Sequence, residues 1–203
     1  MVLMDKQEQW RVFCAIDLPR VICEKVMAHS RRLREAVPEA QASWSRMDNV
    51  HLTLKFLGEI PQSQVKLLSI AAAEASTGHG TFQLSVQRCG VFPTHGEPRV
   101  LWIGIEDLKG RLAELFSRLE DQCAKAGFPR EPRPFHPHLT LARLRRPQHA
   151  RALASAHKTT EFEPAEIVVS ELLVIRSELS SEGSKYSVIS RHALGLSREP
   201  RQL

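Results

Sequence analysis

The tetrapeptide His-Leu-Thr-Leu occurs twice in this chain of 203 residues, at residues 51–54 and 138–141. Each copy begins a run in which polar and apolar residues alternate, and such alternation is typical of a strand with one buried face. The two histidines stand 87 residues apart (138 minus 51). Because the segments around both copies also follow one another in the same order, the pattern indicates two related halves.

Each half is predicted to contain a strand, a helix, a loop, the HLTL strand, a helix that begins at a proline, and a last strand. The expected segments are residues 10–18, 19–36, 51–57, 61–76 and 82–92 in the first half and 99–105, 108–126, 138–144, 147–157 and 167–175 in the second. We therefore predict one domain over residues 1–203, with an internal duplication over residues 10–92 and 99–175 and a closing strand over residues 184–194.

The polar residues of the two motifs carry the chemistry. On a strand, residues i and i+2 point to the same face, so His51 and Thr53 project together, as do His138 and Thr140. If the halves face each other across a cleft, two imidazoles and two hydroxyls converge on one small volume. Such a pair suits an in-line displacement at phosphorus, because one imidazole can take a proton from water while the other protonates the departing oxygen.

The charge distribution is compatible with a phosphate-bearing partner. The chain carries 28 Lys and Arg against 23 Asp and Glu, a net charge of +5 that would equally serve ordinary solubility. Six arginines crowd residues 130–151, with Glu131 as the acid among them: Arg130, Arg133, Arg143, Arg145, Arg146 and Arg151. A solvated basic surface and a nucleic-acid contact both fit this stretch.

Other features narrow the class of protein. No apolar run approaches the roughly 18 residues that span a bilayer, and charges stand where a signal peptide would need its apolar stretch, so we expect a cytoplasmic protein. The four cysteines match no zinc-ligand spacing. Cys14 and Cys23 lie in apolar contexts, which favours buried, reduced thiols.

Residues 51–58 (HLTLKFLG) and 135–143 (FHPHLTLAR) resemble the paired signature motifs of the 2H phosphoesterases. The most similar branch is the family of RNA 2',3'-cyclic phosphodiesterases and 2'-5' RNA ligases. The resemblance covers nearly the whole chain, because further segments stand in family order: FCAIDLP, GVFP, RVLWIGI, GFPREPRPFHPH and SKYSVISRHAL.

The resemblance implies an α+β fold with two lobes, in which two antiparallel sheets flank a central cleft and the helices lie outside. It also implies a hydrolase that needs no metal or other cofactor and opens 2',3'-cyclic phosphate ends of RNA or nucleotides to a 2'-phosphate. Reverse, ligation-type activity on tRNA halves belongs to the family as well. We expect a monomer.

By the same resemblance, His51 is the proton donor and His138 the proton acceptor of the reaction. Thr53 and Thr140 hold phosphate oxygens, and Arg143 is a further ligand for the phosphate or the base. The family also makes Phe56 a candidate to stack on the base. By strand parity Phe56 lies on the leucine side, which favours core packing, although a bulge would expose it.

Several alternatives stay open at this point. His136 competes with His138, but we expect no direct role for it, because it precedes Pro137 and no threonine stands two residues beyond it. A metal site formed by His51, His136 and His138 is disfavoured, because no carboxylate or cysteine shares the motifs. The other histidines, at 29, 79, 95, 149, 157 and 192, are expected to be surface or packing residues without partners.

The sequence predicts different surroundings for two of the tryptophans. Trp102 is expected in the core, whereas Trp44 fits either the core or the surface.

A module that binds RNA ends without catalysis would need arginines and aromatic residues, but it has no use for two titratable imidazoles in matching positions. Opening of a nucleoside 2',3'-cyclic phosphate in the presence of EDTA would distinguish the enzyme from the binding module.

Overall fold

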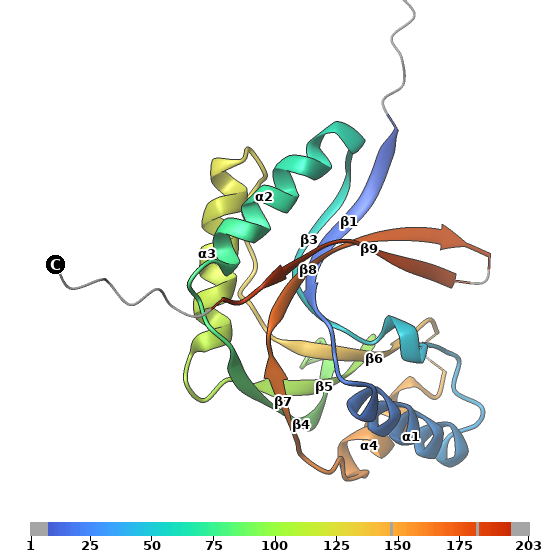
Figure 1. Cartoon of the computed structure of the whole chain (residues 1–203). Helices are drawn as coiled ribbons and strands as arrows, with labels where there is room; N and C mark the ends of the chain where they lie inside the picture. The colour runs from blue at the N-terminus through green and yellow to red at the C-terminus, as the bar shows by residue number, and fades with distance from the viewer. Residues whose placement is uncertain (1–7, 147, 182, 196–203) are drawn as a thin grey trace, which may run out of the picture.

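The computed structural model of the chain describes residues 8–146, 148–181 and 183–195. Within these residues the chain forms nine strands, four α-helices and two short 3-10 helices (Figure 1). In chain order they are β1 (Gln9–Ile16), α1 (Arg20–Ala36), β2 (Ala42–Trp44), η1 (Met47–Asn49), β3 (Leu52–Pro61), η2 (Gln62–Gln64), α2 (Val65–Ser76), β4 (Phe82–Phe92), β5 (Val100–Glu106), α3 (Arg111–Lys125), β6 (His138–Leu144), α4 (Ala150–Thr159), β7 (Ala165–Val169), β8 (Glu171–Ser180) and β9 (Gly183–Ala193). None of these helices is long and apolar enough to cross a membrane.

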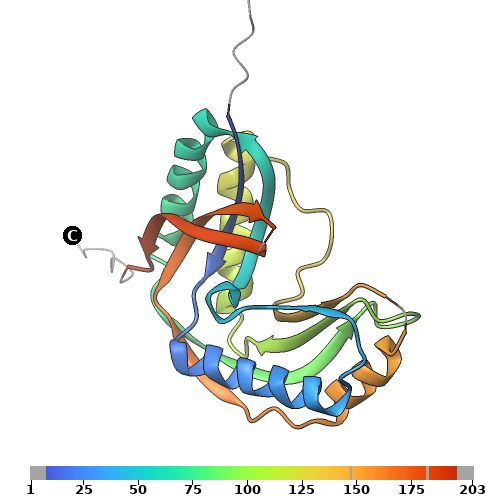
Figure 2. The ribbon, with the colours of Figure 1, turned by 90° about the vertical axis from the view of Figure 1, so that its right-hand side faces the viewer.

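The strands form two antiparallel sheets, which lie in the upper and lower parts of Figure 2. The first sheet has the order β3-β1-β8-β9 and the second the order β2-β6-β5-β4-β7. Helices α2 and α3 pack together on the first sheet, and α1 and α4 pack together on the second. We call these units the first lobe and the second lobe. The predicted α+β class, with two antiparallel sheets and the helices outside, is confirmed.

The two lobes exchange elements along the chain. Helix α1 follows a strand of the first sheet but packs with α4 in the second lobe, and α3 follows a strand of the second sheet but packs with α2 in the first lobe. Strand β4 likewise joins the second sheet, while β8 returns to the first. In sheet order, strands β3, β1 and β8 of the first sheet therefore correspond to strands β6, β5 and β4 of the second sheet. A common origin of the two halves stays a prediction.

The helix starts follow from local chemistry. Pro19 fixes the backbone before α1, and its carbonyl accepts the Ile22 and Cys23 amide hydrogens at 2.9 and 3.2 Å. Before α3, the Asp107 carboxylate accepts hydrogen bonds from the amides of Arg111, Leu112 and Ala113, which an unbonded helix start would leave unpaired. Both starts place a helix directly after a strand of the opposite lobe.

Three details differ from the sequence-based expectation. The helix expected over residues 108–126 begins at Arg111, because Asp107 directs its start there, and Leu108 lies before α3 and is 83% exposed. The strand expected over residues 167–175 is two strands in different sheets, separated at Ser170. The helix expected from Pro147 begins at Ala150, and Pro147 itself lies outside the described residues.

Strand β1 is buried on both faces, which explains its run of apolar residues. Val12, Cys14 and Ile16 belong to the main core between sheets and helices. Phe13 and Ala15 point the other way and form a second, smaller cluster with Leu173, Ile175 and Tyr186. Cys14, Cys23 and Cys123 are buried, and all four cysteines are free thiols, as expected for the first two.

Candidate active site

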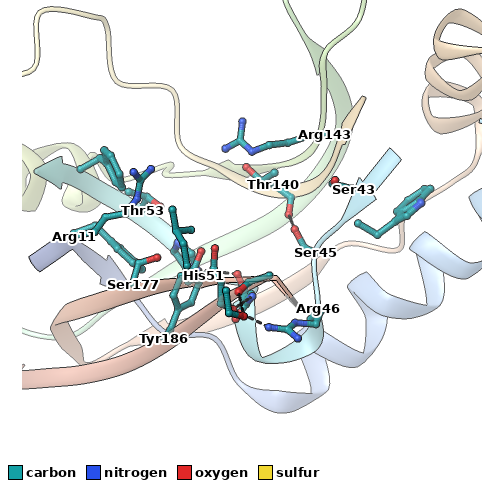
Figure 3. Close-up of a pocket in the computed structure, with 18 of the residues that line it drawn as sticks. Arg11, Ser43, Ser45, Arg46, His51, Thr53, Thr140, Arg143, Ser177 and Tyr186 are labelled. Carbon is teal, nitrogen blue, oxygen red and sulfur yellow. Dashed lines mark hydrogen bonds between the residues drawn. The ribbon is translucent and has the colours of Figure 1, made fainter. Parts of the chain in front are cut away.

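The facing sides of the two sheets enclose a cleft of about 850 Å³ that collects the predicted site residues. His51 and Thr53 reach it from the first lobe, and His138 and Thr140 reach it from the second. Figure 3 shows His51 and Thr53 on one side and Thr140 and Arg143 on the other. Phe56 lines the cleft as well. The fold thus brings all six predicted residues to one cavity: His51, Thr53, Phe56, His138, Thr140 and Arg143.

Each motif histidine is held by the carbonyl two residues before it. His51 Nδ1 lies 2.9 Å from the Asn49 carbonyl oxygen, and His138 Nδ1 lies 2.6 Å from that of His136. A carbonyl only accepts hydrogen bonds, so both rings donate from Nδ1, and in the neutral form the lone pair is on Nε2. The same local device therefore sets the same tautomer in both lobes.

Aromatic rings orient the two imidazoles further. The His51 ring stacks on Phe13, with centroids 4.7 Å apart, and meets the edge of Tyr186 at 5.3 Å. His138 meets Phe92 edge-on at 5.1 Å and lies 6.4 Å from Trp102. These contacts restrict ring rotation, so that each Nε2 has a fixed direction.

Burial lowers the pKa of both motif histidines, because removal from water disfavours the charged ring. Neighbouring charges differ between them. After burial and the Asn49 hydrogen bond, the Asp17 carboxylate acts on His51 and raises its pKa, whereas the Arg143 guanidinium and His136 lower that of His138. The neighbouring charges thus act in opposite directions on the pKa values of the two rings.

The cleft is strongly basic. It is lined by the five arginines Arg11, Arg46, Arg133, Arg143 and Arg145, and no Asp or Glu is among its described lining residues. Of the basic stretch predicted from the sequence, Arg133, Arg143 and Arg145 line the cleft, while Arg130 forms an ion pair with Asp121 at 2.7 Å. The stretch is therefore divided between the cleft and the outer surface.

A bulge in β3 decides where Phe56 and Lys55 point. Across from β1, Thr53 pairs with Ala15 and Lys55 with Cys14, so the register shifts within the motif strand. As a result Phe56 is 47% exposed and faces the cleft, as the bulge alternative predicted, and core packing is wrong for it. The Arg11 guanidinium lies 4.7 Å from its ring centroid.

The same bulge buries Lys55, which the strand pattern had placed on the open face. Its ammonium group donates to Glu120 Oε1 and to the Pro129 carbonyl, both at 2.7 Å, and both charged side chains are under 10% exposed. Glu120 Oε2 also accepts the Glu131 amide at 3.0 Å. This buried ion pair ties the first motif strand and α3 to the loop that leads to His138.

Trp102 was expected in the core, but it lies on the cleft side of β5, half-buried. It stands opposite Gly90 on one neighbouring strand and Thr140 on the other, and a side chain at Gly90 would collide with its indole ring. Glycine at this position is therefore required for the ring to lie flat on the sheet. Trp44 is half-buried at the cleft wall, with the Arg34 guanidinium 4.9 Å from its ring centroid.

Two further expectations concern histidines. The His136 ring lines a smaller neighbouring cavity of about 350 Å³ and lies 6.3 Å from Phe92, while its carbonyl holds His138. Within the described residues, His51, His136 and His138 do not gather as a metal-ligand cluster. His29 and His157 are buried and hydrogen-bonded to each other, so the expectation that they lack partners is wrong.

Several cleft residues escaped the sequence analysis: Arg11, Phe13, Ser43, Ser45, Arg46, Asn49, Ser177, Ser184 and Tyr186. Arg46 and Asn49 both donate to the Ser184 carbonyl, at 2.8 and 2.9 Å, and so attach the β8–β9 hairpin beside the cleft. Tyr186 is the single tyrosine of the chain, which was the one available signal. Phe13 and Ser184 lie in segments that resemble the family, but nothing in those segments marks them as site residues, and the others stand outside the quoted segments.

Comparison with known proteins gives consistent results. Residues 24–180 match the family model of the 2'-5' RNA ligase superfamily. The chain is 30% identical to an RNA 2',3'-cyclic phosphodiesterase of Methanothermobacter thermautotrophicus, over 87% of this chain and 95% of that protein. It is 37% identical to the Escherichia coli protein of the same name, over 67% and 73%. The crystal structure of E. coli LigT complexed with 3'-AMP superposes with a TM-score of 0.71 at 29% identity, covering 92% of this chain and 99% of that one.

Proposed function

The chain belongs to the 2'-5' RNA ligase superfamily, and on that basis we propose that it is an RNA 2',3'-cyclic phosphodiesterase that leaves a 2'-phosphate. The observation that carries the proposal is the repeated histidine arrangement in a basic cleft. Two imidazoles with the same tautomer, one from each lobe, face a cavity lined by five arginines. A cyclic phosphate is an anion that needs proton transfer on both sides of phosphorus, and this cleft offers both.

In the proposed reaction, His138 Nε2 takes a proton from water as the water oxygen forms a bond to phosphorus. The bond between phosphorus and O3' breaks, and His51 Nε2–H gives its proton to that oxygen, so the phosphate stays on O2'. Thr53, Thr140 and Arg143 bind the non-bridging oxygens, whose charge grows in the transition state. Proton exchange with solvent then restores the starting protonation of both rings.

The charges around the two rings support this assignment of roles. The acid must be protonated at the start, and the Asp17 carboxylate favours a charged His51. The base must be neutral, and the Arg143 guanidinium favours a neutral His138. The difference in local charge thus agrees with the roles that the family resemblance implies.

The same site would catalyse ligation if a 5'-hydroxyl of RNA took the place of water as the attacking group. Attack by that hydroxyl on the cyclic phosphate joins two RNA ends, such as tRNA halves, through a 2'-5' linkage. Phe56, exposed at the cleft with Arg11 over its ring, would stack on the base of the bound end. The monomeric state and the cytoplasmic location stay predictions from the sequence.

The decisive experiment is an assay of the purified chain on a nucleoside 2',3'-cyclic phosphate with EDTA present. Phosphorus NMR of the product distinguishes a 2'-phosphate from a 3'-phosphate. We expect turnover and the 2'-phosphate alone. Binding of the nucleotide without turnover would instead favour the RNA-end-binding module, and a 3'-phosphate would overturn the assignment of the leaving oxygen.

A further inference from the structure

A second cluster of chemically reactive side chains lies within the second lobe, between its helices and its sheet and away from the cleft. His29 on α1, Cys89 on β4 and His157 on α4 bring one nitrogen, sulfur and nitrogen atom within 4.8 Å of one another. Both histidines are fully buried, and Cys89 is partly buried. None of these residues lines the cleft, so the proposed reaction leaves them without a role.

Two of the three distances are close to the edges of a zinc coordination tetrahedron, and the third, between the ligand atoms of Cys89 and His157, is no longer than 4.8 Å. His29 Nε2 lies 3.0 Å from His157 Nδ1 and 3.6 Å from Cys89 Sγ. Zinc bound at about 2.0 Å to nitrogen and about 2.3 Å to sulfur separates two nitrogens by about 3.3 Å and a nitrogen from a sulfur by about 3.5 Å. The distance from His29 Nε2 to Cys89 Sγ already has this length. The distance between the two nitrogens would increase by a few tenths of an ångström on zinc binding.

The far side of His157 resembles the surroundings of a metal-bound histidine. His157 Nε2 lies 3.0 Å from the Trp102 carbonyl, to which it donates, so its Nδ1 toward the cluster carries the lone pair. On the far side of His29, Arg32 Nη2 lies 3.3 Å from Nδ1. Zinc would select the His29 tautomer with its proton on Nδ1, which directs a second lone pair at the cluster.

Without a cation, His29 has a hydrogen-bond partner on each ring nitrogen, His157 at Nε2 and Arg32 at Nδ1. A neutral His29 ring has a single N–H group. That group can serve the Glu161 carbonyl or His157 Nδ1, but not both. Arg32 Nη2 lies 3.3 Å from His29 Nδ1 and 2.9 Å from the Glu161 carbonyl, so a tautomer that donates to His157 also fits.

We propose that His29, Cys89 and His157 form a binding site for a single zinc ion that joins α1, α4 and β4. Two neutral imidazoles and one thiolate are ligands that zinc prefers, with water in the fourth position. Binding requires Cys89 to lose its thiol proton to solvent. Burial raises the pKa of this thiol to about 11, and Arg32, whose positive charge acts in the opposite direction, stabilises the thiolate.

The site is structural and independent of the cleft chemistry. It connects helices that come from different halves of the chain, because α1 precedes β3 whereas α4 follows β6. Its ion would stabilise the folded second lobe, since the three ligands are gathered only in the folded chain. It also reaches Trp102, the cleft-side residue near His138, through the His157 hydrogen bond.

The test is a titration of the full chain with cobalt after chelator treatment and removal of the chelator. Tetrahedral cobalt with a thiolate ligand gives visible bands and a near-ultraviolet thiolate-to-cobalt absorption. We expect one equivalent to bind, zinc to displace it, and the melting temperature to rise by several degrees with zinc. Cys89→Ser should abolish the thiolate band and weaken binding by roughly 100-fold or more, an effect at least as large as losing a supporting contact.

Cys23→Ser is the matched control, because Cys23 is also a buried thiol but lies outside the cluster, and it should bind cobalt as the unaltered chain does. His157→Gln provides a second variant if Cys89→Ser does not fold. The unaltered chain alone can overturn the proposal. Absence of a thiolate-to-cobalt band at micromolar metal, or its persistence in Cys89→Ser, would show that the cluster is a hydrogen-bond network only.

Discussion

In the first lobe His51 lies between Phe13 and Tyr186 and is influenced by a carboxylate, whereas in the second lobe His138 lies near Phe92 and Trp102 and is influenced by a guanidinium. The backbone contact that sets each tautomer is the same in both lobes. The shared contact makes both residues fit for proton transfer. In the proposed mechanism the unlike charges suit the two residues to different tasks, and the predictions below test that difference.

The largest expected effect is the loss of either imidazole. His51→Ala and His138→Ala should each lower turnover roughly 10²- to 10⁴-fold, because each removes one proton transfer from the same transition state. The double variant should cost far less than the product of the two single losses. Circular dichroism controls for folding, and single-turnover assays measure the rates. Near-full activity of His138→Ala would end the two-histidine mechanism.

A substrate with a better leaving group should separate the two lobes. If the group on the 3' side leaves without protonation, the acid is dispensable but the base is not. His51→Ala should therefore recover most of its lost activity on such a substrate, and His138→Ala should recover none. The measurement is the ratio of rates on the activated and natural substrates for each variant. Recovery by His138→Ala alone would reverse the roles of the two lobes.

The threonines should matter equally in both lobes, in contrast to the histidines. Thr53→Val and Thr140→Val keep the β-branched shape and remove only the hydroxyl that would bind a phosphate oxygen. Loss of a hydrogen bond to a charged group should slow turnover about 10- to 100-fold, less than loss of a histidine. Steady-state rates at saturating substrate measure this. If both valine variants match the unaltered chain, the threonines only shape their strands.

The parts predicted from the sequence are those with a local signal. Strand alternation located β3 and β6, and residues i and i+2 placed His51 with Thr53 and His138 with Thr140. The helix starts after Pro19 and Pro61 were also predicted from a local signal, whereas α4 begins at Ala150, later than predicted. The exchange of α1 and α3 between the lobes had no local signal, because it depends on which sheet each helix packs against.

The errors have a common physical cause. The alternation of side chains along a regular strand placed Phe56 in the core and Lys55 on the open face, but a bulge in β3 reversed both positions. A bulge depends on the strand that pairs with β3, so the sequence of β3 alone does not reveal it. Trp102 was assigned to the core because the glycine that makes room for it, Gly90, lies on another strand. Arg11 and Tyr186 come from segments far from the motifs, so only the folded sheet brings them to the cleft.

The smallest expected effect concerns the charges that distinguish the lobes. If His51 acts as acid, it must be protonated, and its pKa sets the alkaline limb of the rate profile. If His138 acts as base, it must be neutral, and its pKa sets the acidic limb.

Asp17 raises the pKa of His51, so Asp17→Asn should move the alkaline limb to lower pH. Arg143 lowers the pKa of His138, so Arg143→Gln should move the acidic limb to higher pH. Asp17 and Arg143 are both exposed, so each shift should be small and should shrink in high salt. The measurement is the pH dependence of turnover for each variant at low and high ionic strength. If each variant moves the limb that belongs to the other lobe, the assignment of acid and base is reversed, and if neither limb moves, the local charges do not distinguish the two histidines.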